Sequence, residues 1–209
     1  KYLKRVRGDH TPAPAAIIDH VENFGHDKTA MSAGEMNIFP NLLVGSASKN
    51  LRRVFYLTDA VRKSARGVSG IERLHVVGAG VMGGDIAAIG AMAGLDVTLA
   101  DMNGAAIKNA ITRAAKLFER RLKNEDKVAA ALERLRSDPD GHGAADADLV
   151  IEAVAEKLDV KQAVFQNLES VCKTGAILAT NTSAIPLEDI ATALNAPEHL
   201  IGLHFFNPV

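Results

Sequence analysis

One histidine of the chain, His204, lies where its chemistry could be used. It follows an apolar run typical of a buried strand, in the segment Gly202-Leu-His-Phe-Phe-Asn-Pro-Val209. Histidine titrates near neutral pH, so its side chain can take the proton of a hydroxyl group while a hydride leaves the same carbon. The other histidines lie in polar or loop contexts, or inside a predicted strand, and we interpret them as structural. The residues alone leave a catalytic and a structural role for His204 equally open.

A second chemical signal is the pattern Gly78-x-Gly80-x-x-Gly83, which joins a predicted strand to a predicted helix. Gly78 permits a tight turn, Gly80 lets the backbone approach a pyrophosphate, and Gly83 allows the helix to pack closely on the strand. The free N–H groups and the dipole at the start of the helix favour an anion. Because glycine is common in turns, this pattern is a weak signal by itself.

Asp101 strengthens the case for a dinucleotide. It ends the next predicted strand, about 20 residues after the glycines, where a carboxylate can accept hydrogen bonds from the ribose hydroxyls of adenosine. Its charge would repel a 2′-phosphate, and Met102-Asn103 offers no arginine to hold one, which favours NAD over NADP. The alternative is that Asp101 only caps a turn. The order strand, turn, helix, strand and acid favours the dinucleotide.

From residue 71 onward, predicted strands alternate with predicted helices. This alternation predicts a parallel sheet covered on both faces, which is a Rossmann-type, doubly wound α/β fold. Ligands of such sheets bind beyond the carboxyl ends of the strands, so the segments that follow the strands should form the site. We expect strands at 74–77, 96–100, 148–154, 176–180 and 200–205, and helices at 81–93, 103–124, 127–136, 158–171 and 186–194.

Residues 1–70 lack this alternation and are predicted to form a helical segment that ends in a linker. A short helix begins near Pro12, residues 25–40 are polar and predicted to be irregular, and a second helix covers 51–63. The composition of residues 64–70 is that of a linker. Two helices with irregular connections bury little surface, so this segment should need a partner. The expected domains are 1–70 and 71–209.

Composition excludes several classes of partner. With 47% hydrophobic and 23% charged residues the chain resembles an ordinary globular protein, and its net charge of −1 gives no electrostatic reason to bind nucleic acid or anionic membranes. No apolar run is long enough to span a bilayer. The acidic residues near His142 lack the spacing of a calcium or zinc site, so we expect no metal. The single cysteine suits a reducing compartment, either the bacterial cytoplasm or, as the alternative, the mitochondrial matrix.

A resemblance to a known family rests on four segments: Val77-Gly-Ala-Gly-Val-Met-Gly-Gly84, Asp148-Leu-Val-Ile-Glu-Ala-Val-Ala-Glu156, Thr180-Asn-Thr-Ser183 and Gly202-Leu-His-Phe-Phe-Asn-Pro-Val209. These segments resemble the NAD-binding domain of L-3-hydroxyacyl-CoA dehydrogenases, as found in the multifunctional alpha subunit of fatty acid oxidation complexes. The resemblance covers residues 71–209, and its last segment is the most specific. Less specifically, residues 51–63 resemble the linker helix before that domain, and residues 10–24 resemble the last helices of an enoyl-CoA hydratase module.

The resemblance implies roles for individual residues. His204 would be the catalytic histidine, and Ser183 would lie between the nicotinamide and the substrate oxygen. The family's glutamate that orients this histidine would lie beyond Val209, as would the helical domain that completes the substrate pocket. Both ends of the chain look cut, so we expect a fragment that binds NAD and is incomplete for catalysis. The residues implied around NAD are Met82, Asp101, Val154, Ala155, Glu156, Lys161 and Asn207, besides Gly78, Gly80 and Gly83.

The implied activity is the NAD-dependent oxidation of an L-3-hydroxyacyl-CoA to a 3-oxoacyl-CoA, with His204 as general base. The implied partners are the acyl-CoA and further copies of the complete chain, and a thiolase subunit is left open. One alternative is another β-hydroxyacid or 3-hydroxybutyryl-CoA dehydrogenase, against which the linker helix argues. The other is a non-catalytic NAD-binding module, which the combination of Ser183, His204 and Asn207 disfavours.

Overall fold

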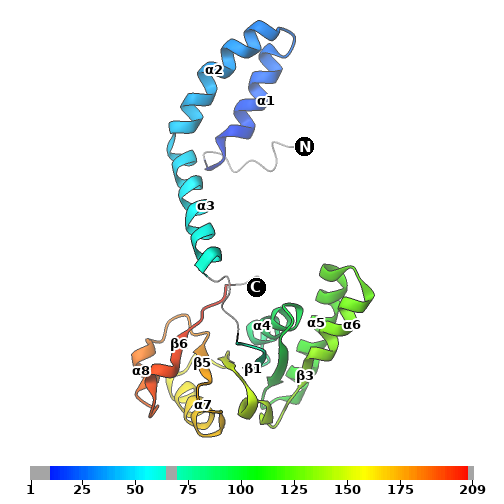
Figure 1. The fold of residues 1–209 in the computed structure, drawn as a ribbon, viewed down its shortest axis with the longest axis vertical. Coiled ribbons are helices and arrows are strands. Elements are labelled where there is room, and N and C mark those ends of the chain that lie inside the picture. Colours follow the sequence, from blue (N-terminus) through cyan, green and yellow to red (C-terminus); the bar gives the residue numbers. More distant parts are fainter. Residues whose placement is uncertain (1–9, 65–69, 207–209) are drawn as a thin grey trace. The chain divides into compact units, whose positions relative to one another are not determined.

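The computed structural model describes residues 10–64 and 70–206. The chain divides into two compact units, residues 1–68 and 69–209, at a point near the boundary expected from the sequence. The first unit is built from helices and the second is an α/β domain (Figure 1). All of the predicted site residues belong to the second unit.

The second unit is built on a six-stranded sheet in which all neighbouring strands are parallel. The strands lie in the order β3-β2-β1-β4-β5-β6. The direction of chain progression reverses between β1 and β4, and this is the switch point at which such sheets bind ligands. The predicted Rossmann-type fold is therefore confirmed. The strands are β1 (Arg73–Val77), β2 (Asp96–Ala100), β3 (Leu135–Ser137), β4 (Leu149–Glu152), β5 (Ile177–Thr180) and β6 (Leu200–Gly202).

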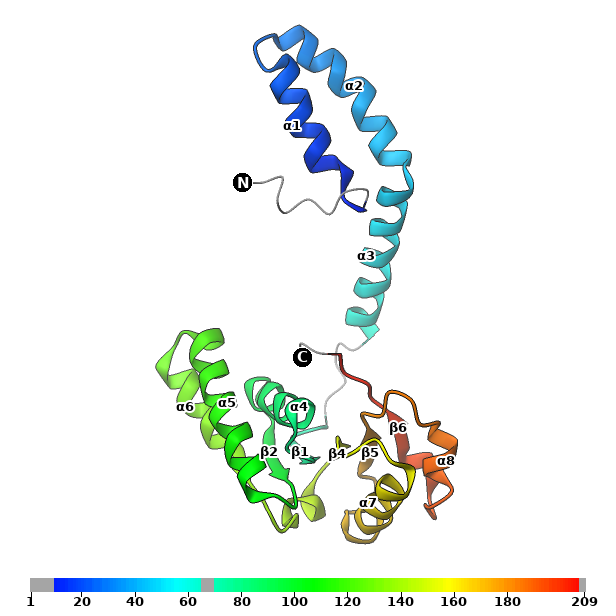
Figure 2. The same cartoon turned by 180° about the vertical axis from the view of Figure 1, so that it is seen from behind.

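Helices cover both faces of the sheet, as Figures 1 and 2 show. On one face α4 (Val81–Met92), α5 (Gly104–Leu122) and α6 (Glu125–Arg134) share a core with β1 and β2. On the other face α7 (Leu158–Val171) and α8 (Leu187–Ala191) share a second core with β4 and β5. Neighbouring residues of a strand point to opposite faces of the sheet, so they pack into different cores. In β4, Ile151 lies in the first core and Val150 lies in the second. This explains why the strands are continuous apolar runs.

Several predicted elements of the second unit differ at their ends from those observed. The strand predicted at 148–154 covers only Leu149–Glu152, and the helix predicted at 186–194 covers only Leu187–Ala191. The predicted helix at 127–136 is wrong at its end, because α6 ends at Arg134 and Leu135–Ser137 pairs with β2 as β3. Three residues are too few for an alternating pattern to show a strand. The last strand is shorter than predicted, because β6 ends at Gly202. His204 therefore lies two residues beyond the end of β6 rather than within the strand.

The first unit consists of α1 (Pro12–Phe24), α2 (Lys28–Val44) and α3 (Ser46–Ser64). The prediction of an irregular segment at 25–40 is wrong. Asp27 caps α2 by accepting hydrogen bonds from the N–H groups of Thr29 at 2.8 Å and Ala30 at 3.2 Å. Residues 65–69 of the predicted linker lie outside the described part of the chain. Within that described part, no helix is both long and apolar enough to cross a bilayer.

Candidate active site

The glycine turn after β1 has the geometry that the sequence pattern predicts. Gly78 has a φ of +104°, and a Cβ there would lie 2.5 Å from the carbonyl oxygen of Ala153. A Cβ on Gly83 would lie 1.8 Å from the carbonyl oxygen of Gly78. Both positions therefore exclude any side chain, and Gly78 brings the turn after β1 against the segment after β4. These are the two segments that flank the switch point.

Gly80 differs from its two neighbours in the pattern, because a Cβ there would meet no atom within 4 Å. Gly80 is also the N-cap of α4, and it has no side chain to occupy the N–H groups of the first helical turn. These N–H groups and the helix dipole favour an anion in the open space before the turn. This arrangement fits the pyrophosphate of a dinucleotide. Met82, implied as a neighbour of the cofactor, is half-buried in the same first turn.

Asp101, at the end of β2, is bonded directly to the glycine turn. Its Oδ2 accepts a hydrogen bond from the N–H of Ala79 at 2.7 Å, and its Oδ1 accepts one from the N–H of Asn103 at 2.8 Å. Asp101 thus caps a turn, which was the alternative reading of its role. A carboxylate has about four lone-pair positions, so these two bonds leave capacity for ribose hydroxyls. The two roles are compatible.

A buried ion pair lies behind the segment that follows β4. Glu152 is fully buried and Lys161 is 1% exposed, and their Oε1 and Nζ atoms are 2.7 Å apart. The same Oε1 accepts a hydrogen bond from the N–H of Val154 at 2.7 Å. Oε2 accepts one from the hydroxyl of Thr180, on β5, also at 2.7 Å. Glu152 therefore ties α7, the end of β4 and the end of β5 together, and its buried oxygens are satisfied.

Glu156 continues this network to the surface. Its Oε2 lies 3.2 Å from Nζ of Lys161, and its Oε1 accepts hydrogen bonds from the hydroxyl of Thr182 and from the N–H of Ser183, the latter at 3.0 Å. Partial burial acts to raise the pKa of Glu156, but the bonds from Thr182, Lys161 and Ser183 outweigh it and hold that pKa at about 2. Glu156 is therefore ionised at neutral pH, and it fixes the loop that carries Ser183.

His204 is held through the backbone on both of its sides. The N–H of Leu203 donates to the carbonyl oxygen of Thr180 at 3.0 Å, and the N–H of Phe205 donates to Oδ1 of Asn181 at 2.8 Å. The histidine segment is thus fastened to the end of β5, although β6 has already ended. Because β5 and β6 are parallel neighbours, both segments leave the sheet at the same edge.

The remaining predicted site residues lie at this edge or outside the described chain. The side chain of His204 is exposed, and its ring packs at a tilt against Phe206 with the centroids 4.6 Å apart. Ser183 and Ala155 are exposed at the ends of their loops. Asn207 falls outside the described residues. The structure thus brings Glu156, Lys161 and Ser183 into one bonded cluster, and Gly78, Gly80, Gly83 and Asp101 into another.

The sequence predicts Glu152 as supporting structure and gives no individual role to Thr180 or Asn181. The structure shows that all three residues join the segments of the site. The signal for Asn181 lies in the segment Thr180-Asn-Thr-Ser183, where a polar run follows directly on a buried strand. Glu152 is a carboxylate within an apolar strand, and such a position is rare without a buried partner. The nine-residue spacing to Lys161 does not by itself reveal that partner.

Residues 73–209 match the family model for the NAD binding domain of 3-hydroxyacyl-CoA dehydrogenase. The chain belongs to this family. Its cofactor is NAD, consistent with the open space before Gly80 and with the carboxylate of Asp101.

Relatives of the chain are found both among curated proteins and among solved structures. Across 99% of its length the chain is 34% identical to the fatty acid oxidation complex subunit alpha of Shewanella frigidimarina, and it spans 30% of that protein. Among solved structures, 3-hydroxybutyryl-CoA dehydrogenase from Escherichia coli K12 is 38% identical with a TM-score of 0.64, and the match covers 67% of this chain and 30% of that one. FadB2 of M. tuberculosis is 40% identical with a TM-score of 0.64, over 68% of this chain and 51% of that one.

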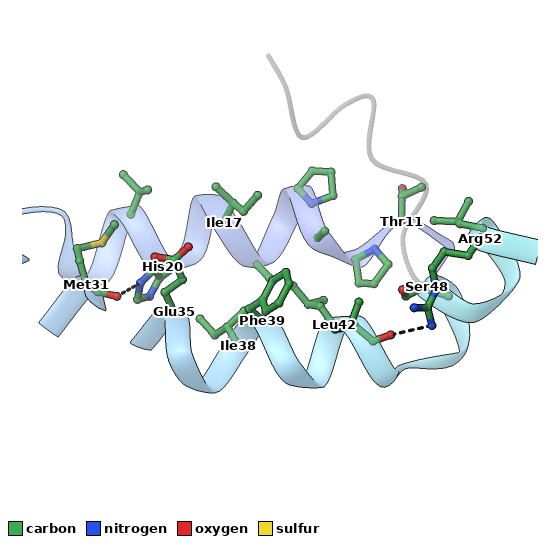
Figure 3. Close-up of a pocket in the computed structure, with 18 residues that line it drawn as sticks. Thr11, Ile17, His20, Met31, Glu35, Ile38, Phe39, Leu42, Ser48 and Arg52 are labelled. Carbon is green, nitrogen blue, oxygen red and sulfur yellow. Dashed lines mark hydrogen bonds between the residues drawn. The ribbon is translucent and has the colours of Figure 1, made fainter. Parts of the chain in front are cut away.

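A cavity of about 650 Å³ lies among α1, α2 and α3 of the first unit, and Figure 3 shows the side chains around it. Most of these side chains are apolar, including Ile17 and Phe39. Nε2 of His20 lies 2.8 Å from the carbonyl oxygen of Met31, whereas its buried Nδ1 has no hydrogen-bond partner among the described residues. In the described parts of both units, no three His, Cys, Asp or Glu side chains are grouped to hold a metal ion.

Proposed function

We propose that this domain serves the oxidation of L-3-hydroxyacyl-CoA to 3-oxoacyl-CoA, with His204 as the general base. The observation that carries the proposal is the pair of backbone bonds on either side of His204, from Leu203 to Thr180 and from Phe205 to Asn181. They hold an exposed imidazole at the carboxyl edge of the sheet, beside the segment of Ser183. A structural histidine needs neither this exposure nor this position.

The roles of the residues follow from their chemistry. NAD, when bound, supplies the acceptor for the hydride of the 3-hydroxyl carbon. The imidazole of His204 takes the proton of the hydroxyl group. The neutral side chains of Ser183 and Asn207 suit the orientation of the 3-hydroxyl group and of a carboxamide, because each can donate and accept hydrogen bonds.

We further propose that the first unit is the end of a hydratase module with its linker helix. The relatives named fatty acid oxidation complex subunit alpha match 99% of the chain, whereas the solved dehydrogenases match only 66–68% of it. This difference supports an origin of the first unit in the multifunctional proteins. An oligomer of the complete protein, a thiolase partner and a reducing compartment stay predictions.

Assays of the complete protein with acetoacetyl-CoA and NADH test the proposal. We expect turnover in the wild type, and loss of turnover with an unchanged Kd for NAD in His204→Gln. Loss of NAD binding in that variant would contradict the role of His204, and an inactive wild type would favour a non-catalytic module. Relatives named 3-hydroxybutyryl-CoA dehydrogenase make short-chain specificity the second candidate, and a profile of acyl chain length separates the two.

A further inference from the structure

The cluster Glu152–Lys161–Glu156 carries two carboxylates and one ammonium group. Its members are joined in a row, with 2.7 Å from Glu152 to Lys161 and 3.2 Å from Lys161 to Glu156. Glu152 is closed off from solvent, whereas the side chain of Glu156 is 40% exposed. Glu152 pairs with the ammonium group of Lys161 on the buried side of the cluster. The cluster therefore has one net negative charge, and the exposed end of the cluster is the carboxylate of Glu156.

That outer end lies at the cofactor edge of the sheet. Glu156 follows β4, and the glycine turn after β1 packs against Ala153 and Val154 of the same segment. The nicotinamide ring of NAD+ carries a positive charge, and the ring of NADH carries none. A net negative charge at this edge attracts the oxidised ring more strongly than the reduced one, and a neutral ion pair would not distinguish the two.

We propose that Glu152 is a specificity-determining residue, whose buried charge offsets Lys161 and so makes the cofactor edge favour NAD+ over NADH. The proposal rests on NAD binding at the switch point, as the proposed function requires. In this proposal Glu152 influences cofactor binding in addition to joining β4 to β5. A glutamine at that position retains a hydrogen-bonding group for Thr180, but it would leave Lys161 and Glu156 as a pair without net charge.

Binding constants of the 209-residue chain for NAD+ and NADH, measured by calorimetry, test this inference. In Glu152→Gln we expect the ratio Kd(NAD+)/Kd(NADH) to rise by roughly two- to tenfold, the range for one charge acting through partly solvated protein. A merely structural role for Glu152 would weaken both dinucleotides by the same factor. An unchanged ratio would therefore overturn the proposal.

Thr180→Val is the matched control, because it removes the hydroxyl bond to Oε2 of Glu152 while it keeps side-chain shape and charge. We expect both constants to change together, with a constant ratio. A ratio that rises as much in this variant as in Glu152→Gln would show that loosening of the network, and not charge, sets the preference. Circular dichroism of both variants checks the fold.

Glu156→Gln provides a second measurement if Glu152→Gln does not fold. Glu156 is partly exposed, so its neutralisation leaves no buried ammonium without a partner, since Glu152 still pairs with Lys161. The ratio should rise in the same direction, even though both affinities also fall with the loss of the Ser183 contact. An unchanged ratio here contradicts the inference. A wild type that binds neither dinucleotide would contradict the proposed function instead.

Discussion

The N–H of Phe205 donates to Oδ1 of Asn181 at 2.8 Å, and this bond joins the segment of His204 to the segment of Ser183. The two residues belong to neighbouring strand ends, and neither is a candidate for the chemistry itself. The bond fixes the distance between two loops whose side chains would face one substrate. Positioning of this kind is where small displacements are costly to an enzyme.

Replacement of Asn181 should therefore affect turnover more than binding. In Asn181→Ala the N–H of Phe205 loses its acceptor, and we expect kcat of the complete protein to fall by roughly tenfold to a hundredfold. The Kd for NAD should change little. Asn181→Asp keeps an acceptor oxygen at the same place, so it should retain more of kcat than the alanine variant. Equal losses in the two variants would show that this hydrogen bond is not what matters.

Two glycines of the same turn should respond in opposite ways to alanine. Gly80→Ala adds a methyl group that meets no protein atom, so the melting temperature should stay unchanged while the Kd for NAD rises. Gly83→Ala places its methyl group 1.8 Å from the carbonyl oxygen of Gly78, so the domain should lose stability. Thermal melts and calorimetry measure both effects. A Gly80→Ala variant with wild-type NAD affinity would place the pyrophosphate elsewhere.

The sheet and the glycine turn could be predicted because their signals are local. Each long strand is an apolar run. Gly78 has a positive φ and Gly83 packs against the carbonyl oxygen of Gly78, so both glycines meet a steric need within a few residues. Asn103 shows the same locality, since it accepts a hydrogen bond from the N–H of Ala105 and so begins α5 where predicted. The location of Asp101 beside the glycine turn could be predicted from the number of residues that separate the two along the chain.

The parts that could not be predicted depend on contacts between distant segments or on very short elements. The pairing of β3 with β2 is three residues long, and α2 lacks the one-sided apolar stripe that reveals a helix. The partners of Glu152 come from three different elements, and nothing in the sequence reports their distances. Lys161, implied near NAD, has a buried side chain whose ammonium group pairs with the carboxylates of both Glu152 and Glu156, and its place near NAD stays a prediction.

His75 should make the domain sensitive to acid. Burial lowers the pKa of His75 from its ordinary value of 6.5, and the carboxylate of Asp138, 3.7 Å from Nδ1, acts in the opposite direction. Below pH 6.5 the unfolded chain takes up a proton that the folded chain resists, so stability falls as pH falls, by at most about 1.4 kcal/mol per pH unit. Urea unfolding between pH 7.5 and pH 5 measures this slope.

The matched variant for that measurement is His75→Gln, which cannot titrate. Nδ1 of His75 lies 2.7 Å from the hydroxyl of Thr98, and an amide offers Thr98 a similar partner. We expect the variant to be less stable than the wild type at pH 7.5 but to lose less stability on acidification. Equal slopes in the two proteins would assign the acid sensitivity to other groups.

Glu156 should contribute to stability only when it is ionised. Its pKa of about 2 in the folded chain lies below the ordinary value of 4.5, because Thr182, Lys161 and Ser183 hold the charged form against the effect of burial. The contribution is therefore fully present above pH 4.5, and it is lost as pH falls through about 2. Since 40% of the side chain is exposed, the effect should be modest. In urea unfolding, Glu156→Gln should be less stable than the wild type at pH 6, and the difference should shrink steadily below pH 4.5. If the difference in stability stays constant down to pH 3, the variant is destabilised by altered packing and not by the loss of the charge. The Ser183 loop would then not depend on the ionised carboxylate.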